Sequence, residues 1–232
     1  MTEPARLLLT RPLAAAQRFV AALEAARGGP VPAILSPILD IHPVAVALQP
    51  RPAGLILTSE NAAARLGELG LEGLPAWCVG PRTAAVAQTQ GASIREVGSN
   101  ADSLVAALRA ARPQGPLLHL RGEHARGDLA ARLRAEGIDV GEAIAYRQGA
   151  LPPTAEARAA LRGAEPLVVP LFSPRSAMLL ARWRPRAPLS VVALSEAVAD
   201  AAAPLRPAGL VVARAPEGAA MVEATIQAIA PP

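Results

Sequence analysis

The chain of 232 residues is 52% hydrophobic and 18% charged, so it has enough apolar surface to bury one large core or two modest ones. All 23 basic residues are arginine, which excludes P-loop nucleotide hydrolases, pyridoxal enzymes and imine-forming aldolases because each needs a lysine amine. The net charge of +4, with only 2% aromatic residues to stack on bases, indicates small anionic ligands rather than nucleic acid.

The same residues bear on compartment, membrane and metal. Apolar runs are broken by proline well short of the roughly 20 residues that cross a bilayer, so we expect no membrane partner. The N-terminus lacks the pattern of a signal peptide and Cys78 is the only thiol, so we expect a cytoplasmic protein without disulfides. His42, His119 and His124 show no paired ligand spacing; we interpret them as structural or surface histidines and expect no metal site.

Strands and helices alternate along the whole chain. A short apolar run is followed by a turn and then, in most segments, by an alanine-rich helix. In chain order these segments lie at residues 7–23, 31–38, 54–66, 77–87, 93–108, 117–133, 140–148, 168–180, 191–201 and 209–224. Such alternation predicts α/β structure with parallel sheets covered by helices on both faces.

The second half of the chain repeats the first. Ser59 and Ser173 each follow a buried strand and lie 114 residues apart, and two further strand–turn–helix segments agree on the same offset. Both serines stand where a helix begins, so each is a candidate N-cap, as is Ser99 with capping-box spacing to Asp102. We therefore predict two similar flavodoxin-like parallel-sheet domains of about five strands each.

A functional interpretation of these serines stands beside the structural one. In doubly wound sheets, ligands bind at the carboxyl ends of the strands, where helix N-termini offer free N–H groups to anions. That edge of each sheet, here called its rim, would be built by the turns that contain "TSEN", "VGPRT", "GSNADS" and "LRGEH" in one unit and "TRP", "FSPRS", "LSEA" and "ARAPEG" in the other.

The order of the motifs "LLLTRP", "SPIL", "LILTSENA", "CVGPRTAAVA", "LLHLRG", "AIAYR", "LFSPRSA" and "VVARAPEG" resembles the uroporphyrinogen-III synthase family over nearly the whole chain. The resemblance implies two interleaved domains: residues 1–37 with 150–232 form the first, and residues 38–149 the second. It also implies that two strand-like crossings join them, near the proline-bearing segments 36–43 and 146–154.

The activity implied by the resemblance is cofactor-free cyclisation of hydroxymethylbilane, a linear tetrapyrrole polycarboxylate, to uroporphyrinogen III. The terminal hydroxyl leaves as water, an azafulvene forms, and a spiro intermediate inverts ring D. Without enzyme the substrate closes to the symmetrical isomer, so the main task of the protein is to hold one geometry. This agrees with a sequence that shows no catalytic triad and no paired catalytic carboxylates.

The resemblance also implies roles for individual residues. Tyr146, the only tyrosine, matches a family tyrosine at a crossing, where its phenol would help the hydroxyl depart or would serve only in packing. Hydroxyls and nearby amides would orient substrate carboxylates, and arginines would pair with them. The expected substrate-binding residues are Arg11, Thr58, Ser59, Thr83, Arg121, Gly122, Ser173 and Ser195.

One turn departs from the family pattern, which often reads Gly-x-Thr where this chain has Leu194, Ser195 and Glu196. Two other functions also stay open. A non-catalytic ligand-binding module with the same duplicated fold would need a polar site as well, since fold does not determine function. A flavodoxin-type flavin protein would need a phosphate loop and flanking aromatic residues, which the sequence does not offer. For the oligomeric state we expect a monomer.

Overall fold

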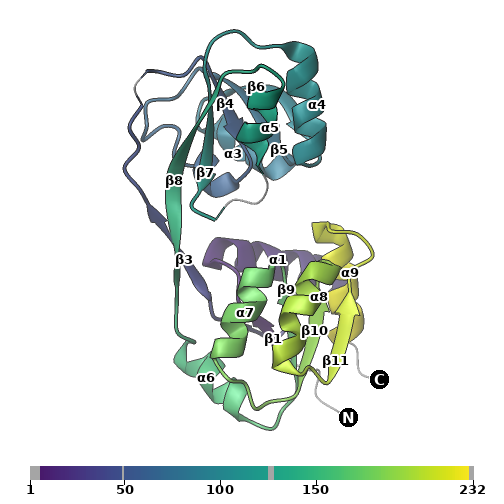
Figure 1. The fold of residues 1–232 in the computed structure, drawn as a ribbon. Helices are drawn as coiled ribbons and strands as arrows, with labels where there is room; N and C mark the ends of the chain where they lie inside the picture. Colours follow the sequence, from purple (N-terminus) through teal and green to yellow (C-terminus); the bar gives the residue numbers. More distant parts are fainter. Residues whose placement is uncertain (1–5, 49, 125–127, 230–232) are drawn as a thin grey trace. The chain divides into compact units, whose positions relative to one another are not determined.

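The structure, a computed structural model, describes residues 6–48, 50–124 and 128–229. The chain divides into two compact units (Figure 1). Unit 1 consists of Met1–Asp40 and Gly149–Pro232, and unit 2 of Ile41–Gln148. Unit 1 is therefore discontinuous in sequence, and the whole of unit 2 lies between its two pieces.

Unit 1 is built on a parallel sheet. Its five strands lie in the spatial order β2 (Ala33–Leu35), β1 (Arg6–Leu9), β9 (Leu167–Leu171), β10 (Leu189–Ala193) and β11 (Gly209–Val212). Each neighbouring pair is parallel. Counted along the unit, the strands follow the order 2-1-3-4-5, which is the order of the flavodoxin fold.

Helices cover both faces of the unit 1 sheet because successive strand residues point to opposite sides. On one face Leu7 and Leu9 pack with Phe19 of α1 (Leu13–Arg27) and Met221 of α9 (Gly218–Ile229). Leu8 faces the other way, into a core shared with α6 (Ala155–Arg162), α7 (Pro174–Arg182) and α8 (Glu196–Ala202). A short 3-10 helix, Ala203–Leu205, follows α8.

Unit 2 repeats this plan on a sheet of six strands. Their spatial order is β3 (Leu39–Pro43), β8 (Val140–Ala150), β7 (Leu117–Gly122), β4 (Gly54–Leu57), β5 (Pro75–Val79) and β6 (Ser93–Gly98). One face packs on α2 (Glu60–Ala63) and α3 (Pro81–Thr89), and the other on α4 (Ala101–Ala111) and α5 (Leu129–Ala135).

The sequence repeat reappears in space. Strands β4, β5 and β6 of unit 2 correspond to β9, β10 and β11 of unit 1, and β7 and β8 correspond to β1 and β2. These five strands therefore have the same spatial order in both sheets. Along the chain, however, the first of them in unit 2 is β4, which corresponds to the third strand of unit 1, β9. The prediction of two interleaved flavodoxin-like sheets is confirmed.

Two strands carry the chain from one unit to the other (Figure 1). Strand β3 crosses the boundary at residue 40, and β8 crosses it at residue 148. The Leu151 N–H donates to the Ile38 carbonyl and the Val44 N–H to the Ala145 carbonyl, both at 3.0 Å. Because the numbering rises on one strand as it falls on the other, the two crossings pair antiparallel.

The helix caps confirm two of the three predicted N-caps. Ser59 and Ser173 cap α2 and α7, and the hydroxyl of each accepts a hydrogen bond from a backbone amide of the first turn. The prediction for Ser99 with Asp102 was wrong by one residue. Asn100 caps α4 and forms a reciprocal capping box with Ser103, because its extended backbone places the amide oxygen 2.9 Å from the Ser103 N–H.

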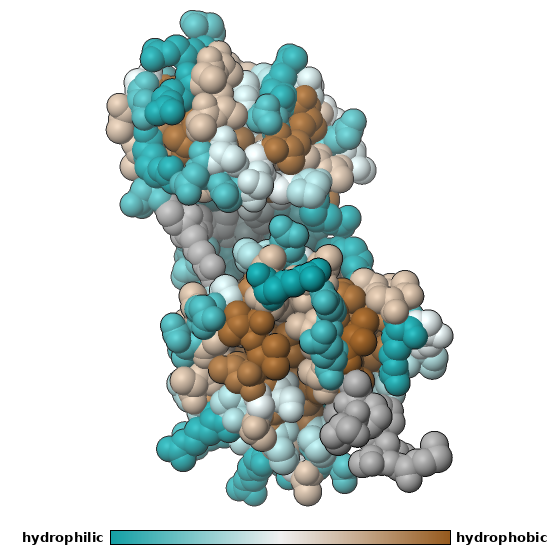
Figure 2. Space-filling model, turned by 90° about the vertical axis from the view of Figure 1, so that its right-hand side faces the viewer, coloured by the Kyte–Doolittle hydropathy of each residue, from teal (hydrophilic) through white to brown (hydrophobic). Residues whose placement is uncertain are grey.

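The surface carries apolar side chains on one side of unit 1, where Figure 2 shows them among hydrophilic neighbours. Strand β11 lies at the edge of its sheet, and its Leu210 and Val211 are exposed. Within the described residues, none of the helices has the length and apolarity needed to span a bilayer.

Candidate active site

The predicted site residues occupy the carboxyl-end rims of the two sheets, and each rim is described separately. In unit 2, Thr58 and Ser59 follow β4, Thr83 lies in the first turn of α3, and Arg121 and Gly122 end β7. Tyr146 lies on β8 directly opposite Gly122. In unit 1, Arg11, Ser173 and Ser195 follow β1, β9 and β10.

Tyr146 is joined to Ser59 in the rim of unit 2. The phenol oxygen lies 2.9 Å from the Ser59 Oγ, which also accepts the Asn61 N–H at 3.2 Å. The ring is only 7% exposed, so packing and this hydrogen bond together hold the phenol in one position. Ser59 therefore caps a helix, as predicted, and in addition contacts the predicted catalytic residue.

Gly122 gives the Tyr146 ring the space that it occupies. A Cβ at position 122 would lie 2.5 Å from the Tyr146 Cζ and 2.7 Å from its oxygen, closer than non-bonded atoms approach. Residue 122 is therefore glycine because of the tyrosine. It was predicted to bind substrate, and the contact that the structure shows is with Tyr146.

Arg65 holds the backbone just before Tyr146, a role that the sequence analysis missed. Its side chain is 8% exposed, and its guanidinium donates to the carbonyls of Val44 and Ala145, one on each crossing segment. The same guanidinium makes two hydrogen bonds to the Glu68 carboxylate, at 2.7 and 3.1 Å, which lower the Glu68 pKa. Two residues that flank α2 therefore hold Tyr146. Arg65 hydrogen-bonds to the backbone just before it, and Ser59 hydrogen-bonds to its hydroxyl.

A second group of polar residues begins at Thr58. Its Oγ1 lies 3.2 Å from the Nε2 of His119, whose ring is 2% exposed. The Nδ1 of His119 has no hydrogen-bond partner among the described residues and lies 3.7 Å from the Glu142 Oε1. Burial lowers the His119 pKa to about 4, so this imidazole is neutral at physiological pH.

Arg121 was predicted to bind a substrate carboxylate. In the structure it forms an ion pair with a carboxylate of the protein itself. Its Nε donates to the Glu142 Oε1 at 2.8 Å, and its Nη1 to the carbonyls of Gly122 and Glu123 at 3.1 and 3.3 Å. A series of contacts therefore joins four side chains at this rim, in the order Thr58, His119, Glu142 and Arg121. Thr83 is also buried, at 6% exposed.

The rim of unit 1 is built around an aromatic pair. The Arg11 guanidinium carbon lies 3.9 Å from the centre of the Phe172 ring, which meets Phe19 edge to face at 5.1 Å. Next to Phe172, the Ser173 Oγ accepts the Ser176 N–H at 3.1 Å. Ser195 is the N-cap of α8, but its side chain makes no capping hydrogen bond. Glu196, which follows it, is exposed.

Sequence reasoning missed three residues of the unit 2 rim: Arg65, His119 and Glu142. A histidine inside the apolar run "LLHLRG" was a visible signal, because a buried imidazole needs a partner. Its partners, however, lie on β4 and β8 and follow from strand register, as in the pairing of His119 with Glu142. The two contacts that Arg65 makes with the crossing segments leave no signal in the local sequence.

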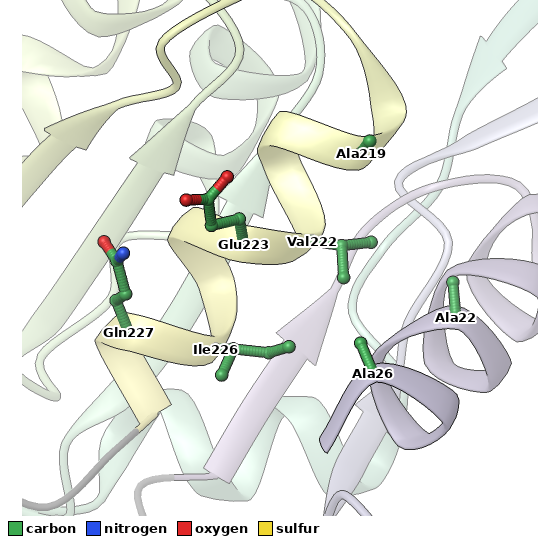
Figure 3. Close-up of a pocket in the computed structure, with 7 residues that line it drawn as sticks. All are labelled: Ala22, Ala26, Ala219, Val222, Glu223, Ile226 and Gln227. Atoms are coloured by element: carbon green, nitrogen blue, oxygen red, sulfur yellow. The ribbon is translucent and has the colours of Figure 1, made fainter. Parts of the chain in front are cut away.

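A groove elsewhere in unit 1 contains none of the predicted site residues. Its cavity volume is about 600 Å³, and it is lined by Ala22, Ala26, Ala219, Val222, Glu223, Ile226 and Gln227. Figure 3 shows Val222 and Ile226 of α9 directed toward the alanines of α1. Among the residues that the structure describes, no three metal-ligating side chains come together.

Comparison with known proteins shows which family and which solved structures resemble this architecture. A family model described as uroporphyrinogen-III synthase HemD matches residues 17–223. No curated protein matches the sequence significantly. Among solved structures, the uroporphyrinogen-III synthetase of Helicobacter pylori is similar with a TM-score of 0.70 at 17% identity, over 96% of this chain and 99% of that one. A mutant uroporphyrinogen III synthase of Thermus thermophilus gives 0.54 at 20%, over 97% and 98%.

These two structural similarities establish a shared fold. The family match extends over most of the chain and therefore identifies the family as well. It includes Thr58, Ser59, Gly122, Tyr146 and Ser173, the rim positions whose surroundings are described above. The chain therefore belongs to the uroporphyrinogen-III synthase family.

Proposed function

We propose that the chain is a uroporphyrinogen-III synthase, a lyase that cyclises hydroxymethylbilane with loss of water and inversion of ring D. The observation that carries this proposal is the family match over residues 17–223. The alternative of a non-catalytic binding module is disfavoured because Ser59, Gly122 and Arg65 together fix the position of Tyr146. A module that only bound its ligand would have no need of one fixed phenol.

In this proposal Tyr146 assists departure of the terminal hydroxyl. We assign the Ser59 O–H as the donor to the phenol oxygen 2.9 Å away, so that the phenol keeps its own proton for the substrate. When that proton passes to the hydroxyl, the C–O bond breaks and water leaves, and the pyrrole nitrogen lone pair forms an azafulvenium ion beside the phenolate. Loss of the pyrrole N–H proton then gives the azafulvene. Proton donation by a positioned side chain usually contributes about 10²- to 10⁴-fold to a rate.

The remaining rim residues hold the substrate. Hydroxyls at Thr83, Ser173 and Ser195, together with first-turn amides there and after Ser59, orient carboxylates, because helix N-termini are favourable positions for anions. Arg11 adds a guanidinium whose flat face rests on Phe172, so that its N–H edge can pair with a carboxylate. Arg121, already paired with Glu142, shapes the end of β7 around Gly122.

We further propose that residues 1–37 with 150–232 and residues 38–149 act as the two functional domains, and that the enzyme works as a cytoplasmic monomer without a cofactor. The charge of +4 and the absence of any lysine support a polycarboxylate substrate bound through arginine.

The test is turnover of hydroxymethylbilane by the purified chain, with the product isomers separated by chromatography. Formation of the ring-D-inverted isomer faster than spontaneous closure supports the proposal. If only the symmetrical isomer appears, at the spontaneous rate, the chain is a binding module.

A further inference from the structure

We propose that His119 fixes the Thr58 hydroxyl as a hydrogen-bond acceptor, so that Thr58 receives an N–H of the ligand instead of binding a carboxylate. His119 is thus a positioning residue that determines specificity at this point of the rim. The inference rests on the proposed function only for the identity of the N–H donor, which in a linear tetrapyrrole is a pyrrole nitrogen.

The geometry begins with a buried imidazole between a hydroxyl and a carboxylate. The His119 Nε2 faces the Thr58 Oγ1 at 3.2 Å, and the Nδ1 faces the Glu142 Oε1 at 3.7 Å. Glu142 is held in place by the Arg121 Nε at 2.8 Å, and the Arg134 guanidinium lies 3.8 Å from its other oxygen. Two guanidinium groups therefore hold this carboxylate next to the ring.

The carboxylate decides which ring nitrogen carries the proton. A neutral imidazole has one N–H and one lone pair. With the proton on Nε2, the Nδ1 lone pair of a ring that is only 2% exposed would face the Glu142 oxygen, and the two would repel each other. With the proton on Nδ1, the N–H points at the negative charge, as in histidines that a neighbouring carboxylate orients. The Nδ1–H tautomer is therefore the stable one.

This tautomer determines what Thr58 can bind. The Nε2 lone pair accepts the Thr58 O–H, which leaves only lone pairs on the Thr58 oxygen. An oxygen that only accepts repels a carboxylate and binds an N–H. The role of orienting carboxylates, which the sequence analysis gave to Thr58, is replaced here by recognition of a pyrrole N–H.

The arrangement persists over the working pH range. Two charged side chains act on the ring, Glu142 on β8 and Arg121 on β7, and Arg134 on α5 lies beside Glu142. Because the His119 pKa is lowered to about 4, mainly by burial, the ring gains a second proton only in acid. Above that pH the Thr58 hydroxyl keeps one direction.

The first experiment reads the tautomer in the wild-type chain without substrate. The chain has 3 histidines, and long-range proton–nitrogen NMR on ¹⁵N-histidine-labelled protein at pH 7 resolves their ring nitrogens. The His119 signals are those lost in His119→Gln. We expect a protonated Nδ1 and an unprotonated Nε2 for His119. A protonated Nε2 would overturn the proposal, and neither result depends on whether the chain is an enzyme.

The second experiment uses Thr58→Val, which keeps the shape and removes the hydroxyl, with Thr58→Ser as its matched control. Loss of one hydrogen bond to a buried N–H should raise KM about 10-fold in the valine variant, and the serine variant should stay within about 3-fold of wild type. Equal KM values for valine and wild type would contradict a ligand contact at Thr58.

A double-variant comparison separates positioning from packing. If His119 acts through Thr58, His119→Gln should change KM in the wild-type background and leave it unchanged in the Thr58→Val background. If the two effects instead multiply, His119 only stabilises the fold and the proposal fails. If the wild-type chain shows no turnover at all, the proposed function fails, and the NMR result still decides the direction of the Thr58 hydroxyl.

Discussion

The two units share one strand order and serine N-caps at matching positions, yet their rims differ in chemistry. In unit 2 the rim side chains bind one another: Ser59 contacts Tyr146, and Thr58 is linked through His119 to Glu142. In unit 1 the Arg11 guanidinium rests on the Phe172 ring, and Ser195 makes no capping bond with its side chain. Polar neighbours thus fix Tyr146 in the unit 2 rim, whereas the unit 1 rim carries a cation on an aromatic face beside the Ser173 and Ser176 hydroxyls, which lie 2.9 Å apart.

This difference indicates a division of labour. Groups that already hydrogen-bond to each other keep their positions while a substrate reacts, which is what a positioned proton donor requires. A stacked arginine binds an anion and need not take part in any bond that breaks. Changes in the unit 2 rim should therefore slow turnover, whereas changes in the unit 1 rim should weaken binding. Each of the following predictions tests that division.

The largest effect is expected for Gly122→Ala. The new Cβ would lie 2.5 Å from the Tyr146 Cζ, so the ring must move and the phenol must leave its place. We expect overpacking to cost about 1–3 kcal/mol of stability and the misplaced phenol to lower kcat by up to about 10²-fold. Gly141→Ala on β8 is the matched control, since its Cβ would meet only ordinary contacts at 3.9 and 4.0 Å. Similar kinetics in the two variants would show that the position of Tyr146 does not matter.

The next effect is a loss of stability in acid that comes from His119. Its pKa is about 4 in the folded chain against 6.5 unfolded. Between these values the unfolded state binds a proton that the folded state does not, so stability falls as pH drops from 6.5 to 4 and this contribution then levels off. Its size is about 3 kcal/mol.

Denaturant unfolding at pH 7 and pH 4 measures this loss. The His119→Gln variant should lose about 3 kcal/mol less than wild type over that interval, because it lacks the titrating ring. His42→Gln, at an exposed histidine, should behave like wild type. The same acid loss in all three proteins would mean that His119 is not the group responsible.

A smaller effect, on binding alone, is expected for Arg11→Ala in unit 1. Losing one charge-assisted hydrogen bond at a partly exposed site should raise KM about 10-fold and leave kcat unchanged. Arg27→Ala provides the control, because Arg27 is exposed in the last turn of α1, the helix that follows Arg11, and lies at the end away from the rim. A fall in kcat for Arg11→Ala at saturating substrate would break the division of labour.

The smallest effect is expected for the paired serines. Ser59→Ala and Ser173→Ala each remove an N-cap and should each cost about 1 kcal/mol of stability. Only Ser59→Ala also removes the partner of the Tyr146 phenol, so it alone should lower kcat, by about 10-fold or less. Equal kinetic effects in the two variants would indicate that both rims serve the same purpose.

The fold was predictable from the sequence because strand–helix alternation and the repeat around Ser59 and Ser173 are local patterns that survive in the folded chain. The ends of strands could be predicted in the same way; Gly122 ends β7, and Tyr146 lies beside it on β8. The partners across strands could not be predicted. Glu142 meets His119 and Arg121 only because β7 and β8 adopt one register, which no local pattern encodes.

Two further differences between the predictions and the structure, the cap of α4 and the burial of Arg65, also have physical causes. Ser99 and Asn100 are both good capping residues, and which one caps α4 depends on where the chain leaves β6. Arg65 follows alanines in a helical segment and would be expected at the surface. It is buried because two carbonyls of the crossing segments and the Glu68 carboxylate satisfy its guanidinium.

The most direct test of the account is the reaction of Tyr146→Phe with saturating hydroxymethylbilane, measured as rate and product isomer together. Phenylalanine keeps the ring and its packing against Gly122 and removes only the hydroxyl. The account predicts turnover slower by up to about 10²-fold, with the enzymatic product still the ring-D-inverted isomer. Wild-type rate and isomer ratio, or a rise of the symmetrical isomer in step with the lost activity, would contradict a proton donor at Tyr146.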